Sequence, residues 1–106
     1  MWKVDKGTKN GTTTASYANA LDWSVEELKE KTIVLKNTHG SFSLNYKLLA
    51  YAYADGIGGE EIGETTLGAG EIAKIQLVKQ WARLVLQVND GSGHASYQVD
   101  YIGQGA

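Results

Sequence analysis

The segment from Lys31 to Gly103 alternates short β-branched and aromatic runs with glycine-centred turns, and this alternation constrains the fold more than any other feature. The clearest runs are residues 82–88 and 95–101, where apolar and polar side chains alternate on either side of the turn from Asn89 to Gly93. A period of two is typical of strands with one buried face, and two such runs around a glycine-rich turn predict a β-hairpin. No interval between runs is long enough for the helix that joins parallel strands, so the sequence predicts an all-β fold.

The predicted architecture is an antiparallel β-sandwich, jelly-roll-like or immunoglobulin-like, with six to eight strands. A chain of 106 residues has room for one thin two-layer core, and we assign that core to a β-sandwich domain spanning residues 23–106. The residues expected to fill it are the apolar members of the alternating runs: Ile33, Leu35, Phe42, Leu44, Tyr46, Leu48, Ile75, Leu77, Leu84, Leu86, Val88, Tyr97 and Val99.

Residues 1–22 differ in kind from the rest, because they are polar and rich in threonine, glycine and asparagine. We interpret them as an extended N-terminal arm with one strand near Thr12–Ala18. Three apolar side chains, Trp2, Val4 and Tyr17, are expected to carry the arm's contacts with an adjacent subunit, for example by adding a strand to the neighbour's sheet.

A single short helix is predicted at Val25–Lys29. Ser24 and Glu27 have the spacing of a capping box, and Trp23 and Leu28 fit a hydrophobic staple around it. The charged residues of this segment fit a solvated connection equally well, so both interpretations stay open.

Composition excludes several classes of partner. The formal net charge of −2, without a basic cluster, gives little attraction to a phosphate backbone, so nucleic acid is not an expected partner. No apolar run reaches the roughly 18 to 20 residues that span a bilayer, and no signal peptide follows Met1, so we expect synthesis in the cytoplasm and no membrane contact. With no cysteine in the chain, disulfides and sulfur-ligated metals are excluded as well.

The absence of proline bears on the sheet edges, since proline is one device that prevents exposed strands from pairing with other molecules. Three windows, Thr32–Lys36, Leu48–Ala54 and Leu84–Val88, combine high β propensity with low charge. Such windows promote aggregation when they lie at open edges. A protein whose edges are covered by neighbouring chains does not need to guard them.

Reactive side chains are few and scattered. His39 and His94 both lie in predicted turns, and a zinc site would need Asp90 or Asp100 as a further ligand, with no motif spacing to support it. Ser92 lies at a hairpin tip without the helix that follows a nucleophilic serine in hydrolases. We therefore expect no catalytic residue, no metal and no cofactor, and predict that the protein is not an enzyme.

The aromatic side chains are the one group that could bind a ligand. Tyr51 and Tyr53 share one strand parity, Tyr97 and Tyr101 share another, and Trp81 lies near a strand start. Exposed rings on a β-sandwich can stack against sugars, whereas aromatic residues are also favoured on any half-buried pleated surface. A carbohydrate-binding or adhesion module is therefore the alternative function, and a core or subunit-interface role is favoured.

Three segments resemble small β-sandwich proteins of tailed phages and related viruses, including head-decoration and other virion-surface proteins. They are Thr32–Lys47, Glu64–Glu71 and Trp81–Val88, which match a "V-K-N-T-G-x-x-x-L" strand and turn, an "L-x-x-G" turn and an "A-R-V-x-V" strand in this order. The resemblance covers about residues 31–103. The chain departs from it at His39, which separates Thr38 from the glycine that directly follows threonine in the motif.

The resemblance implies a viral structural protein that is made in the host cytoplasm and located in the virion. Its expected partners are identical subunits, a major capsid protein or both, contacted through the arm and the sheet edges. A subunit of an extracellular filament is a third interpretation, disfavoured by the missing signal peptide.

Overall fold

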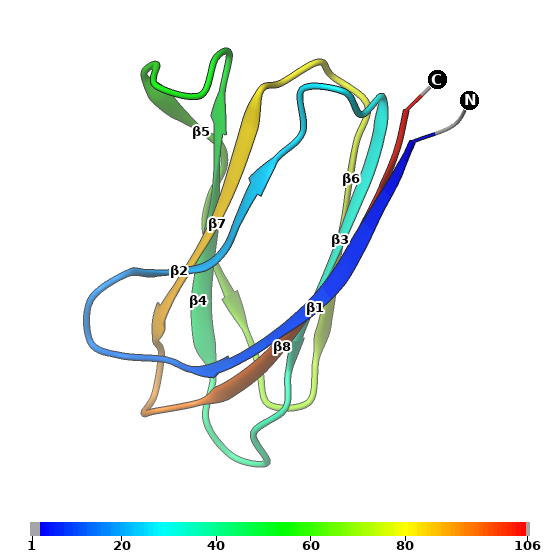
Figure 1. Ribbon diagram of the computed structural model, residues 1–106. Coiled ribbons are helices and arrows are strands. Elements are labelled where there is room, and N and C mark those ends of the chain that lie inside the picture. The colour runs from blue at the N-terminus through cyan, green and yellow to red at the C-terminus, as the bar shows by residue number, and fades with distance from the viewer. Residues whose placement is uncertain (1–2, 106) are drawn as a thin grey trace.

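The computed structural model describes residues 3–105, which form eight β-strands in two four-stranded antiparallel sheets (Figure 1). One sheet has the strand order β1-β8-β3-β6 and the other β2-β7-β4-β5. The strands are β1 (Val4–Thr12), β2 (Ala18–Ser24), β3 (Glu30–Asn37), β4 (Leu44–Tyr51), β5 (Gly58–Leu67), β6 (Ile72–Leu77), β7 (Arg83–Asp90) and β8 (Ser96–Gln104). The predicted all-β sandwich is thereby confirmed.

The strand pairing follows a nested order. β4 pairs with β5, β3 with β6, β2 with β7 and β1 with β8, so the chain forms one long hairpin that is wrapped into two layers. The additional pairs β3–β8 and β4–β7 join these four into two sheets, which is the arrangement of a jelly roll. The two ends of the described chain lie side by side, where the Gly105 N–H donates to the Lys3 carbonyl at 2.7 Å (Figure 1).

The expectation of an extended arm over residues 1–22 is wrong for the described part of that segment. β1 pairs along its whole length with β8, and β2 pairs with β7, so both strands belong to the sandwich of their own chain. Gly7 and Gly11 allow this polar strand to pack in the sandwich. The Tyr101 and Tyr97 rings lie against the backbone of these glycines, in the space that a Cβ would need. The strand is held by backbone pairing and by its neighbour's aromatic rings instead of its own apolar side chains.

The helix expected at Val25–Lys29 is also wrong, because this segment forms a turn. The Leu28 N–H donates to the Val25 carbonyl at 3.0 Å, but the flanking backbone donors bond to other parts of the chain. The Val25 N–H donates to Ala82 and the Lys29 N–H to Gln104. Val25 and Leu28 are buried in the core, so tertiary pairing replaces the hydrogen bonds that a helix would make within itself.

The core lies between the sheets and contains most of the residues expected from the alternation. Phe42 is an exception, since it is 40% exposed and precedes β4. Its ring stacks on His39 in the β3–β4 connection, with 4.8 Å between ring centroids. Tyr97 is only partly buried at the margin of the core. No helix among residues 3–105 has the length and apolar character needed to cross a membrane.

The buried ammonium group of Lys31 hydrogen-bonds to two of the connections between strands. Its side chain is fully buried on β3, and Nζ donates to the carbonyls of Leu28 at 3.2 Å, Lys29 at 3.3 Å and Lys79 at 2.7 Å. Burial lowers the pKa of this amine. The three carbonyls come from the β2–β3 and β6–β7 connections, so one side chain holds both against the end of the sandwich.

Candidate functional site

The five aromatic residues considered for ligand stacking do not form one platform. Tyr97 and Tyr101 project from β8 toward the interior, where Tyr101 packs on Trp23 with 4.9 Å between ring centroids. Both rings also cover the glycines of β1, so their faces are already occupied by protein atoms. These two tyrosines serve packing between the sheets.

The other three aromatic residues lie on the opposite sheet and its loops. Tyr51 is half-buried on β4, with its ring against Gly58 and the Arg83 guanidinium 4.9 Å from its centroid. Arg83 in turn donates to both carboxylate oxygens of Asp22, at 2.7 and 2.6 Å. Tyr53 is 68% exposed in the turn after β4, and Trp81 is half-buried against the core in the β6–β7 connection. Of these three residues, Tyr53 is the one whose side chain is largely exposed.

The three residues expected to make arm contacts are also separated. Trp2 lies outside the described residues. Val4 is 54% exposed at the start of β1. Tyr17, in the β1–β2 connection, donates its hydroxyl to Glu64 Oε1 at 2.5 Å, and Lys47 Nζ lies 4.3 Å from its ring centroid. Through these contacts, Tyr17 holds the β1–β2 connection against the sheet that contains β4 and β5.

The Tyr17 contacts predict a distinct alkaline titration. Burial, together with the hydrogen bond and charge of Glu64, raises the pKa of Tyr17 to about 12. The neutral phenol is therefore favoured by folding. Its stabilising effect is complete below the unfolded pKa of about 10 and is lost as the pH rises through the folded value. In an absorbance titration of tyrosinate, we expect Tyr17→Phe to remove amplitude from the highest-pH step. Loss of amplitude near pH 10 in Tyr17→Phe would contradict this assignment.

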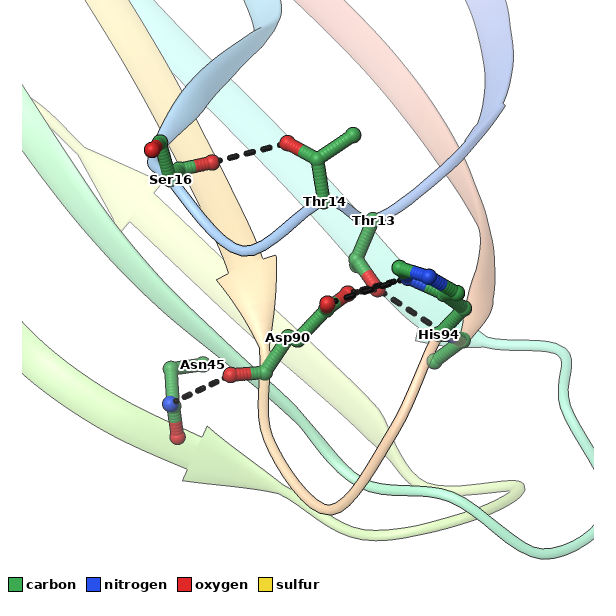
Figure 2. A network of polar contacts seen from close by, with 7 residues as sticks. Thr13, Thr14, Ser16, Asn45, Asp90 and His94 are labelled. Carbon is green, nitrogen blue, oxygen red and sulfur yellow. Dashed lines mark hydrogen bonds and ion pairs between the residues drawn. The ribbon is translucent and has the colours of Figure 1, made fainter.

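A polar network at one end of the sandwich contains a hydroxyl, a carboxylate and an imidazole (Figure 2). The buried Thr13 hydroxyl donates to Asp90 Oδ1 at 2.5 Å and accepts from the Ala95 N–H at 2.8 Å. His94 Nδ1 lies 3.0 Å from Asp90 Oδ2. The Thr13 hydrogen bond, assisted by His94 and opposed by partial burial, holds the pKa of the Asp90 carboxyl below its usual range. Asn45 also donates to the Asp90 carbonyl at 3.2 Å.

This network connects three segments of the chain. The Thr13 hydroxyl donates to Asp90 and not to the histidine, whose side chain is 72% exposed. His39, the second histidine, accepts the backbone N–H groups of Ser41 and Phe42 at Nδ1, at 3.0 and 3.1 Å. Among residues 3–105, no group of three or more His, Cys, Asp or Glu side chains is placed to hold a metal ion.

The four edge strands differ in how they are protected from pairing with other chains. β1 points two charged side chains, Asp5 and Lys9, toward the interior side of its sheet, and Asp5 accepts the Trp23 indole N–H at 2.9 Å. β2 is bulged between Asn19 and Leu21, and β5 has two irregularities in its pairing with β4. Inward charges and bulges are recognised devices against edge pairing.

β6 has none of these devices. Its pairing with β3 is continuous from Ile72 to Leu77, and its inward side chains are the apolar Ala73, Ile75 and Leu77. Ile72 is 50% exposed and Val78, the residue after the strand, is 69% exposed. Within the described chain, β6 is therefore the edge best suited to receive another strand.

The hydrogen-bond parity of β6 shows which backbone groups are free. The Asn37 N–H donates to the Glu71 carbonyl at 3.0 Å, which marks these two residues as a hydrogen-bonded position of the β3–β6 ladder. Because such positions alternate in antiparallel pairs, Ala73, Ile75 and Leu77 bond to β3. Ile72, Lys74 and Gln76 then direct their N–H and C=O groups away from the sheet.

A groove of about 450 Å³ runs beside this edge, between β6 and β5. Its walls include four apolar side chains that are buried or partly buried, namely Tyr46, Ile62, Ile75 and Leu77. Glu61 also lines it, with Oε1 3.5 Å from Lys79 Nζ and Oε2 buried without a hydrogen-bond partner. The β6 edge and this groove together form the candidate site, called here the β6 edge site.

The sequence alone does not single out the β6 edge site among the predicted strands. The aggregation-prone windows lie in β3, β4 and β7, which are all paired on both sides. Residues 72–78 show the same alternation as other strands, and their inward face has no charge, as in the interior strands β4 and β7. That feature becomes informative only when the sheet order shows that β6 is at an edge.

Comparison with known proteins gives the fold but no family. No protein-family model matches the chain, and no curated protein matches it. Solved structures with the same fold include a subunit of Bacillus endospore appendages, which are disulfide-linked pili, at 11% identity, TM-score 0.68 and coverage of 99% of this chain and 88% of that chain. The SPBc2 prophage-derived protein YomS matches at 12% identity, TM-score 0.60 and coverage of 96% and 95%.

A third match is the VP2 subviral particle of infectious bursal disease virus, at 9% identity and TM-score 0.54. The match covers 97% of this chain but 32% of the VP2 chain, so it corresponds to one part of that chain. PirA and a Yersinia pseudotuberculosis-derived mitogen share the fold as well. At these identities the similarity shows the β-sandwich fold alone, which is shared by a pilus protein, a prophage-derived protein and the protein of a subviral particle.

Proposed function

We propose that this chain is a non-enzymatic structural subunit that assembles through the β6 edge site. Its proposed role is that of a capsid-decoration or other virion-surface protein. The observation that carries the proposal is the contrast between β6 and the other edges of the sandwich. β1, β2 and β5 carry inward charges, a bulge or irregular pairing, whereas β6 presents a continuous ladder with a wholly apolar inward face.

Backbone chemistry supports this role for the edge. Unpaired N–H and C=O groups at a strand edge form the same hydrogen bonds with an added strand as they do inside a sheet. The groove beside β6 reaches core side chains, so an added segment would also remove apolar surface from water. The partner in this proposal is an identical subunit, a major capsid protein or both, and the proposed location is the virion.

Self-assembly of the purified chain tests the proposal. We expect light scattering to report a mass that rises with protein concentration, and electron microscopy of the same samples to show discrete assemblies. A chain that stays monomeric across the whole concentration range and fails to bind virus-like particles would contradict a structural role. Enzymatic turnover assigned to the purified chain would contradict the non-enzymatic part of the proposal.

A further inference from the structure

We infer that two copies of this chain pair through β6 in antiparallel orientation, about a two-fold axis at Ile75, so that two four-stranded sheets become one continuous sheet of eight strands. The inference rests on the proposed function and names the first partner of the β6 edge site as a second copy of the same chain. Three features of β6 support this pairing: the parity of its free backbone groups, the positions of its exposed apolar side chains and the charges along the strand.

The backbone parity limits the possible registers. Ile72, Lys74, Gln76 and Val78 share one parity, and the first three direct backbone groups outward. An added antiparallel strand must therefore oppose these residues with outward-directed residues of its own. When the strand is a second β6, the two-fold axis then falls at a residue between Ala73 and Leu77.

The side chains select the axis at Ile75. In this register Ile72 lies opposite the partner's Val78, and Lys74 lies opposite the partner's Gln76. The two residues at the ends are the strongly exposed apolar side chains of this edge, 50% and 69% exposed, and each would be covered by the other. Apolar cross-strand pairs stabilise sheets, and a lysine opposite a glutamine carries no charge repulsion.

The neighbouring registers lack this complementarity. An axis at Lys74 places Lys74 opposite the partner's Lys74 and leaves Ile72 opposite the partner's Gln76. An axis at Gln76 places Lys74 opposite the partner's Val78, so an ammonium faces an apolar side chain. Like charges directly opposite each other destabilise a strand pair, which disfavours the first of these registers.

Disulfide trapping tests the register, and the chain has no native cysteine to interfere. Lys74→Cys and Gln76→Cys are purified separately, mixed and oxidised. Residues opposed in a hydrogen-bonded pair have Cα atoms about 5.5 Å apart, within the range that a disulfide requires. We expect the mixture to form the heterodimer at least about tenfold faster than either variant forms a homodimer, because diagonal neighbours are about 7 to 8 Å apart. A Lys6→Cys and Thr8→Cys mixture on β1 is the matched control and is expected to stay reduced.

Sedimentation of the same variants before oxidation distinguishes an error in the Ile75 register from an error in β6 pairing or in the proposed assembly. Rapid homodimers of Lys74→Cys or of Gln76→Cys alone would overturn the register at Ile75. Self-association without any disulfide in the Lys74→Cys and Gln76→Cys mixture would overturn β6 pairing and leave an assembly role through another surface. Monomers at every concentration, with no disulfide, would overturn both the pairing and the proposed function.

Discussion

Replacing Lys31 with methionine is expected to lower the free energy of unfolding by about 2 to 4 kcal/mol. Methionine has a similar length and no donor, so three carbonyls lose the ammonium that now lies 2.7 to 3.3 Å away. Removing a buried charge can be neutral when its surroundings are apolar, because the cost of burying the charge disappears as well. Here the surroundings are carbonyl oxygens that methionine cannot satisfy.

Lys36→Met is the matched control for this substitution. Lys36 lies on the same strand but its side chain is exposed, and surface substitutions usually change stability by no more than about 0.5 kcal/mol. Urea denaturation of the three proteins, followed by intrinsic fluorescence, measures the difference. A Lys31→Met protein as stable as Lys36→Met, with an unchanged slope against urea concentration, would show that the carbonyls are satisfied without the ammonium.

Local patterns predicted the parts of the fold that depend on neighbouring residues. The strands β7 and β8 followed from alternation on both sides of one turn, and most of their inward residues lie in the core. The hairpin predicted from that turn is wrong, because β7 pairs with β2 and β4 in one sheet and β8 pairs with β1 and β3 in the other. β1 was not predicted because its position depends on a partner at the other end of the chain, and its glycines are useful only beneath Tyr97 and Tyr101. The segment at Val25 shows the same limit, because its backbone donors are satisfied by Ala82 and Gln104, far away in sequence.

The candidate site was less predictable than the fold. Whether a strand is an edge depends on sheet order, and in this fold the order arises from pairs as distant in sequence as β1 and β8. For that reason the windows with the strongest β propensity proved to be interior strands, while the less conspicuous run from Ile72 to Val78 lies at an open edge. Lys31 was equally hidden, since nothing in a single lysine at a strand start indicates three carbonyls around it.

Lys74→Pro is expected to weaken self-association at least about a hundredfold while the chain stays folded. The Lys74 N–H points away from β3, so proline removes no hydrogen bond within the sheet. It does remove a donor from the free edge and places a ring where the added strand would lie. A hundredfold loss corresponds to about 2.8 kcal/mol of association free energy. In the two-fold arrangement the change acts on both subunits.

Lys6→Pro provides the control on the other edge of the same sheet. The Thr13 N–H donates to Ala95 and the Gly105 N–H to Lys3, which by alternation places the Lys6 N–H on the free side of β1. Both substitutions therefore replace an exposed lysine at an outward edge position and remove one positive charge. Their effects on folding are expected to match, so a difference in association reports on the edge itself. Equal weakening by both would indicate a general effect of proline on the sandwich.

Sedimentation equilibrium of the wild-type chain, Lys74→Pro and Lys6→Pro over the same concentration series tests assembly through β6 most directly. We expect the wild-type chain and Lys6→Pro to reach at least twice the 11.5 kDa mass of one chain, and Lys74→Pro to remain at the mass of one chain. Association of Lys74→Pro as strong as that of the wild-type chain would contradict the account.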